Sequence, residues 1–350
     1  MKCETIRELL IQRIAEGVYP RDKALPSERA LAEEFSVARA TLRQALQSIA
    51  DDGMLYAVHG RGYFIRTSEK GGMKIAVLVS GYAYTEIFSE LVKSIRSDAM
   101  RLGLGMALWN ASCDDPELSG ARALEMAQEL VRTEVSGVIY QPIQFCSRAE
   151  YYNRRILEIF RESHLPVVLI DCALKVTSAD QAYDFVSMDN FRAGYTLAEH
   201  LTKTGSRQIR FLARPGYGPS VRDRIQGLIA VQRGIDPLWT ADPKSVREIE
   251  KMIRLDPSAD TIICQNDLVA VELIGTLTEL GFRVPKDFRV AGFDDVKAAR
   301  TCNPPLTTIR QPTADLARSA LESLRLRIAN PRSCTRLVLL QGPLILRGSC

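Results

Sequence analysis

The stretch Leu25-Pro-Ser-Glu-Arg-Ala-Leu-Ala-Glu-Glu-Phe35, continued by Arg39-Ala-Thr-Leu-Arg-Gln-Ala-Leu46, decides the fold of the N-terminal region. Ser27 stands where a helix N-cap is expected, because its hydroxyl can accept a bond from the first turn. Apolar residues then recur every three or four positions, which predicts two short amphipathic helices separated by a tight turn: Leu31, Ala32, Phe35, Leu42, Ala45, Leu46 and Ile49.

The flanking sequence completes a small module. An apolar stripe from Ile6 to Ile14 predicts a first helix that ends at Gly17, and Gly53 is expected to end the third helix. Two β-like stretches follow, 54–58 and 63–66, joined by a glycine-bearing turn. Three helices and a hairpin within 66 residues are the layout of a winged helix-turn-helix.

The remainder of the 350 residues alternates between strands and helices, which predicts an α/β domain with parallel sheets wrapped by helices. We therefore divide the chain into a winged helix (1–66), a polar linker (67–73) and a two-lobed domain (74–350). The expected strands number about eight: 75–79, 105–109, 137–141, 167–171, 185–188, 209–213, 261–264 and 289–293.

Composition excludes several classes of protein. A formal net charge of +4 and 46% hydrophobic residues are ordinary for a globular protein. The eight cysteines form no CxxC pair and the three histidines no HExxH motif, so no metal and no cofactor is expected. No signal peptide and no apolar run of 18 residues occurs, so we expect a cytoplasmic protein without a membrane partner.

The third helix has the features of a DNA-reading helix. Arg39 and Arg43 share one face with Gln47, Thr41 lies nearby, and residues 36–50 contain no acid. Arginine can bond guanine edges in the major groove, and hydroxyls can contact phosphates. The hairpin tip adds His59, Gly60 and Arg61. Each charge alone could equally be solvated, but helix, turn and wing together predict binding to double-stranded operator DNA.

Residues 25–64 resemble the winged-helix domain of the GntR family. In that family an arginine after Pro-Ser-Glu, two recognition-helix arginines and a His-Gly at the wing touch DNA, which implies the same roles here for Arg29, Arg39, Arg43, His59 and Gly60. One position departs from the pattern, because Ala38 replaces the serine that often caps the recognition helix. Losing such a cap typically costs about 1 kcal/mol.

Polar side chains follow several strands of the larger domain, where open α/β sheets bind ligands. They predict a small-molecule site that includes Tyr84, Gln141, Asp171, Asn266 and Asp294. Structural roles compete with this interpretation. Asp189 and Asp267 could be helix caps, Phe185 and Trp109 core residues, and Arg224 alone a solvated charge.

Residues 74–347 are similar to the LacI-type sensor, a relative of periplasmic sugar-binding proteins. The matching stretches are 135–140, 165–171, 220–227, 264–267 and 290–295. The resemblance implies that Arg224, Asn266 and Asp294 bind effector. A GntR head on such a sensor is similar to the arabinose-responsive regulators of mixed type.

We interpret the chain as a transcriptional regulator, expected to be a repressor, that binds its operator as a homodimer and responds to a sugar or related metabolite. Two other classes remain as alternatives. A transport-type solute-binding protein would need a signal peptide, and an enzyme fused to a winged helix would need a catalytic or cofactor motif. Neither feature is found in the sequence.

Overall fold

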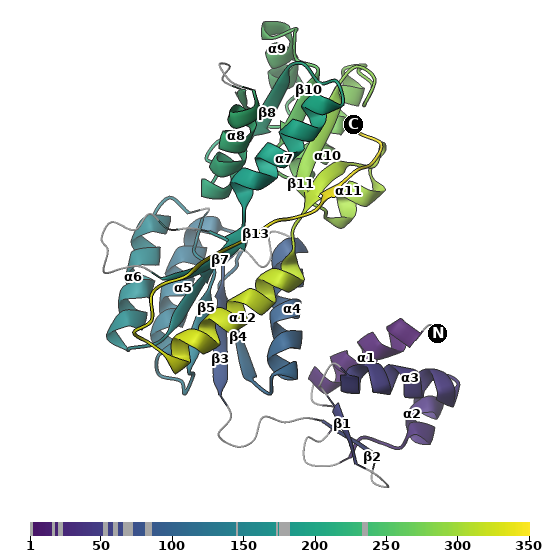
Figure 1. Ribbon diagram of the computed structural model, residues 1–350, viewed down its shortest axis with the longest axis vertical. Helices are drawn as coiled ribbons and strands as arrows, with labels where there is room; N and C mark the ends of the chain where they lie inside the picture. Colours follow the sequence, from purple (N-terminus) through teal and green to yellow (C-terminus); the bar gives the residue numbers. More distant parts are fainter. Residues whose placement is uncertain are drawn as a thin grey trace.

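The structure is a computed structural model. It describes residues 3–15, 18–19, 24–51, 55–58, 62–65, 73–80, 86–144, 146–172, 174, 183–232 and 237–350. The expected helix end at Gly53 and nearly all of the expected linker lie outside these residues. Figure 1 shows a small helical domain and two larger lobes, each built around its own sheet.

The N-terminal domain contains α1 (Cys3–Ala15), α2 (Glu28–Glu34) and α3 (Arg39–Asp51), followed by the antiparallel strands β1 (Leu55–Val58) and β2 (Gly62–Ile65). Ser27 caps α2 as predicted, since its hydroxyl accepts a hydrogen bond from the backbone N–H of Ala30. The apolar stripes of the helices meet in one buried core that includes Ile6, Leu10, Leu42 and Leu46. The winged-helix prediction is thus confirmed.

Lobe 1 has a parallel six-stranded sheet in the order β13-β7-β6-β5-β3-β4. Helices cover both faces, with α4 and α12 on one and α5 and α6 on the other. Its elements are β3 (Lys74–Val79), α4 (Glu86–Arg101), β4 (Gly105–Asn110), α5 (Pro116–Leu130), β5 (Gly137–Tyr140), α6 (Ala149–Glu162), β6 (Val167–Ile170), β7 (Asp184–Met188), α12 (Thr313–Ala329) and β13 (Leu337–Leu340).

Lobe 2 has a second six-stranded sheet in the order β14-β12-β11-β10-β8-β9, in which only β14 runs antiparallel. Its helices α7 and α8 pack on one face, and α9 and α10 on the other. Its elements are α7 (Asn190–Lys203), β8 (Ile209–Ala213), α8 (Pro219–Val231), β9 (Leu238–Thr240), α9 (Val246–Leu255), β10 (Thr261–Cys264), α10 (Asp267–Glu279), β11 (Arg289–Asp294), α11 (Lys297–Thr301), β12 (Thr307–Arg310) and β14 (Leu344–Ile345).

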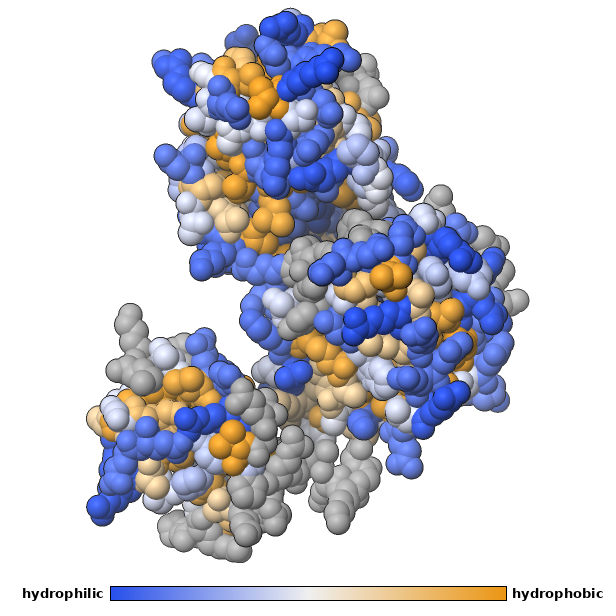
Figure 2. Space-filling model, turned by 180° about the vertical axis from the view of Figure 1, so that it is seen from behind, coloured by the Kyte–Doolittle hydropathy of each residue, from blue (hydrophilic) through white to orange (hydrophobic). Residues whose placement is uncertain are grey.

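The chain crosses between the lobes three times, after β7, after β12 and after β13. The expectation of about eight strands was too low, because it missed β9, β12, β13 and β14. These strands are short, with two to four residues each. Runs this short show little strand periodicity of their own. Figure 2 shows the two lobes as separate rounded masses.

Candidate DNA interface and effector site

The predicted DNA-contacting residues of α2 and α3 lie on the surface of the winged domain. The side chains of Arg29, Arg39 and Arg43 are 79%, 62% and 60% exposed. Arg29 and Arg39 line one groove beside the turn between the two helices. Thr41, on the same helix, is half-buried. The exposed arginines therefore have the accessibility that contact with a nucleic acid requires.

Glu28 at the start of α2 holds the recognition arginines, an arrangement that the sequence pattern did not reveal. Arg43 donates from Nε and Nη2 to the Glu28 carboxylate at 3.0 and 2.7 Å, and Arg39 Nη2 lies 3.9 Å from it. The hydrogen bond from Arg43 lowers the pKa of Glu28. The ionised carboxylate thus fixes the edge of the Arg43 guanidinium that carries Nε and Nη2.

The remaining predicted DNA contacts, His59, Gly60 and Arg61, lie outside the described residues. In the turn before α3, Ser36 has a φ of 53°, a left-handed conformation that closes the tight turn. Ala38 directly precedes α3 and offers no side-chain acceptor for its first turn.

Arg224 is buried between the elements of lobe 2, and the interpretation of a solvated surface charge is wrong. Only 5% of its side chain is exposed. Its Nε donates to Asn190 Oδ1 at 2.9 Å, and Nη1 donates to the backbone oxygen of Gln265 at 2.6 Å. Nη2 lies 3.6 Å from Asp294 Oδ1, and the guanidinium stacks 4.4 Å from the centre of the Phe293 ring.

Two glycines bring Arg224 to this position. A Cβ built on Gly194 of α7 would lie 2.1 Å from the backbone oxygen of Arg224, and one on Gly227 of α8 would lie 2.2 Å from that of Phe191. Only glycine therefore permits this approach of α7 and α8. The close packing places Arg224 on α8 beside Asn190 at the start of α7, so the presence of Gly227 three residues after Arg224 has a structural reason.

Lobe 1 faces this cluster with Asp171, which follows β6 with a φ of 72°. Gln144 Nε2 donates to its carboxylate at 3.0 Å. Burial raises the pKa of Asp171 to about 6, while the charge of Arg224 opposes the rise and that of Asp294 adds to it. Groups from both lobes thus act on one carboxyl, and the expected effector residues Asp171, Arg224 and Asp294 come together between the lobes.

The other predicted effector residues have more varied surroundings. Gln141 is buried, and its Oε1 accepts a hydrogen bond from the backbone of Ser80 at 3.2 Å. Asn266 caps α10, because its Oδ1 accepts from Val269 N at 3.0 Å. Tyr84 lies outside the described residues. Asp294, with a φ of 116°, accepts from Gln311 Nε2 at 3.2 Å, and burial raises its pKa.

The competing structural roles are also settled in part. Asp189 is a helix cap as expected, since its Oδ1 accepts from Arg192 N at 2.8 Å. Phe185 and Trp109 pack against the core of lobe 1. Asp267 is not merely a cap. It is fully buried, and it accepts from Val296 N at 3.0 Å and from the Thr308 hydroxyl at 2.7 Å.

Sequence reasoning missed several members of this site: Asn190, Gln144, Gln265, Phe293 and Gln311. Asn190 could have been found, because it follows a buried strand as the other site residues do. Gln311 lies on a crossing segment that no periodic pattern marks. Among the described residues, no group of three or more His, Cys, Asp or Glu side chains could hold a metal ion.

Two protein families match the chain. Residues 2–65 match the bacterial regulatory proteins of the gntR family, and residues 198–350 match the periplasmic binding protein-like domain. An arabinose metabolism transcriptional repressor of Geobacillus stearothermophilus is 26% identical over 98% of this chain and 96% of its own length. The repressor PurR of Mannheimia succiniciproducens is 28% identical over 83% of each chain.

Solved structures share the fold. A transcriptional regulator CelR–cellobiose complex aligns with a TM-score of 0.67 at 21% identity, over 93% of this chain and all of that one. A LacI family regulator from Enterococcus faecalis with bound ribose aligns with a TM-score of 0.63 at 26% identity, over 79% of this chain and 98% of its own. The chain therefore joins a gntR-type DNA-binding domain to a LacI-type sensor, and it is a transcriptional regulator. No described helix is long and apolar enough to cross a membrane.

Proposed function

We propose that this regulator is a repressor whose hold on operator DNA changes when a sugar or sugar derivative binds between the two lobes. The observation that carries the proposal is the buried Arg224, held by Asn190 and the backbone oxygen of Gln265 and placed beside Asp294. Taking a guanidinium out of water is costly unless partners compensate it. A site built from a buried arginine fork and two carboxylates suits a ligand that presents several hydroxyl groups.

The proposed effector contacts are Arg224, Asn266 and Asp294 from lobe 2, with Gln141, Asp171 and Tyr84 from lobe 1. Because the groups come from both lobes, a ligand that bonds to them simultaneously favours the closed arrangement. A ligand shifts such an equilibrium only by its difference in affinity for the two states. Closure at the three crossing segments is then the event that the DNA-binding domain senses.

The proposed DNA contacts are Arg29, Arg39, Thr41, Arg43, His59, Gly60 and Arg61. We assign the winged domain to residues 1–66, a linker to 67–73 and the sensor to 74–350. The regulator acts in the cytoplasm as a homodimer on a palindromic operator, and it has no catalytic activity of its own. The arabinose repressors and the sugar-bound regulators of similar fold support these assignments.

Two experiments on the full-length protein test this function. Selection from a randomised duplex pool should enrich a palindrome, and a thermal-shift screen of monosaccharides and disaccharides should find a stabilising ligand. Failure to enrich any sequence would remove the regulatory role. Turnover of a stabilising sugar during the screen would revive the alternative of an enzyme fused to a winged helix.

A further inference from the structure

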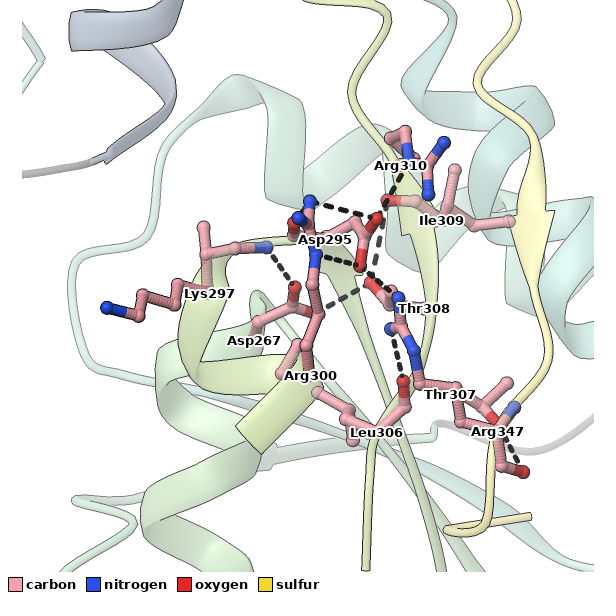
Figure 3. Close-up of polar contacts among 12 residues, drawn as sticks. Asp267, Asp295, Lys297, Arg300, Leu306, Thr307, Thr308, Ile309, Arg310 and Arg347 are labelled. Atoms are coloured by element: carbon pink, nitrogen blue, oxygen red, sulfur yellow. Dashed lines mark hydrogen bonds and ion pairs between the residues drawn. The ribbon is translucent and has the colours of Figure 1, made fainter. Parts of the chain in front are cut away.

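A second charged cluster lies on lobe 2, outside the effector site. Its centre is Asp295, whose side chain is fully buried. Three arginines converge on this carboxylate, from α11, from the end of β12 and from the C-terminal segment (Figure 3). The distances to its oxygens are 3.3 Å for Arg300 Nη2, 2.7 Å for Arg310 Nε and 2.5 Å for Arg347 Nη2.

The charges of this cluster do not balance. One carboxylate faces three guanidinium groups, and among the described residues none of the three arginines pairs with a second acid. Burial opposes ionisation of Asp295, but the hydrogen bonds from Arg310 and Arg347 outweigh it and lower its pKa. Asp295 is therefore ionised at neutral pH, and two positive charges are left without a counter-charge in contact.

The surplus charge is accessible to solvent. The side chains of Arg300 and Arg310 are 55% and 48% exposed, whereas Arg347 is only 17% exposed. Arg310 uses Nε for Asp295, and within the described chain neither of its terminal nitrogens has an acceptor. Arg300 uses Nε and Nη2, which leaves Nη1 available. Donors from two elements are thus held in place by a buried carboxylate.

We propose that Arg300 and Arg310 form a second ligand site, which takes the phosphoryl group of a small phosphorylated metabolite. The two terminal nitrogens of Arg310 can bond two oxygens of one phosphoryl group, and Nη1 of Arg300 can add a third bond; such charge-assisted bonds are the strong ones. A dianion would also neutralise the two surplus charges. Phosphates of the operator are an unsuitable source, because lobe 2 lies at the opposite end of the molecule from the winged domain (Figure 1).

The proposed phosphate site adjoins the effector site of the sensor. Asp295 directly follows Asp294, the proposed effector ligand, and Arg310 ends β12 just before the chain crosses to lobe 1. Gln311, the next residue, bonds to Asp294 through both its side chain and its backbone. An anion bound to Arg310 therefore lies next to Gln311, which begins a crossing segment and contacts the effector site.

Calorimetric titration of the full-length protein tests the proposal without any operator or effector. Inorganic phosphate and glycerol 3-phosphate are titrated at constant ionic strength, with sodium chloride as the control. We expect saturable binding of both phosphates and none of chloride. Heats that match those of chloride would overturn the proposal. Binding of inorganic phosphate with exclusion of the ester would overturn the assignment to a phosphorylated metabolite.

Single variants locate the site. Arg300→Gln and Arg310→Gln should each weaken phosphate binding about tenfold, as expected for the loss of one charge-assisted bond. Arg283→Gln is the matched control, because it removes the same charge from lobe 2 at a position where one arginine pairs with one carboxylate, Asp287. Arg224→Ala should leave phosphate affinity unchanged, which separates this site from the effector site. Equal phosphate affinity in wild type and in both cluster variants would refute the placement of the phosphate site at Arg300 and Arg310. This outcome is independent of the tests of the proposed function.

Discussion

Replacing Arg224 with alanine should abolish the response to effector while leaving operator binding intact. In the structure Nε and Nη1 are committed to Asn190 and to the backbone of Gln265, and Nη2 is the nitrogen nearest Asp294. A ligand hydroxyl beside Asp294 would thus accept a hydrogen bond from Nη2. Loss of one charge-assisted hydrogen bond costs about 1.5–3 kcal/mol, or about 10- to 150-fold in effector affinity.

The same substitution also has a cost in stability. It leaves Asn190 and Asp294 buried without their cationic partner, and breaking a buried ion pair from one side costs about 3–5 kcal/mol. Domains typically have about 5–15 kcal/mol of stability, so the variant should still fold but melt at a lower temperature. A thermal melt therefore precedes the functional assay.

The assay is fluorescence anisotropy of a selected operator duplex, titrated with protein in the absence and presence of the stabilising sugar. Arg222→Ala serves as the control, because Arg222 lies on the same helix but is exposed. Folded Arg224→Ala should bind the duplex like wild type and ignore the sugar, whereas Arg222→Ala should respond normally. A normal response of Arg224→Ala at wild-type sugar concentrations would refute the role given to this arginine.

Four further predictions concern the DNA-binding domain and the sensor. Arg43→Ala should weaken specific operator binding by about 1–3 kcal/mol, and wild-type affinity should fall about 10³- to 10⁵-fold between 50 and 200 mM salt, both measured by anisotropy. Flat salt dependence would contradict the phosphate contacts. Asp171→Asn should raise stability at pH 7 by about 3 kcal/mol in denaturant unfolding, because the buried ionised carboxyl has a pKa of about 6 against an ordinary 3.8. Burial of the ionised Asp171 carboxyl destabilises the wild-type protein fully above pH 6. The stability difference between Asp171→Asn and wild type should therefore shrink as the pH falls from about 6 to about 4. A constant difference would contradict this origin. Asp295→Ala should destabilise the protein by about 3 kcal/mol, since it leaves three arginines without their carboxylate, and an unchanged melting temperature would show that they do not depend on it.

The sequence predicted those elements whose own periodicity reflects burial. The strands 209–213 and 261–264 have the predicted bounds, and Ser27 caps the predicted helix. Strands β12 and β14 are four and two residues long, too short to show a period of their own, and β13 pairs with a partner far away in the chain. This partner is β7, and some 150 residues separate the two strands. Local pattern cannot reveal such pairing.

The candidate site shows the same division. Asp171, Asn266 and Asp294 were predicted because they follow buried strands, where ligand-binding residues gather. Arg224 alone looked like a surface charge, since neither its helix nor its neighbours indicate that Gly194 and Gly227 let two helices approach closely. The bond between Glu28 and Arg43 joins residues 15 positions apart and depends on the angle between two helices. Such contacts depend on tertiary packing and cannot be deduced from the spacing of residues in the sequence.

The central claim is that one chain couples a ligand between the lobes to DNA held by the winged domain. The direct measurement is the dissociation constant of the wild-type protein for its selected operator. It is measured with and without a saturating concentration of a sugar that calorimetry has shown to bind. The account predicts a change of about tenfold or more, corresponding to a coupling of about 1–3 kcal/mol. A sugar that binds and leaves the operator dissociation constant unchanged would contradict it.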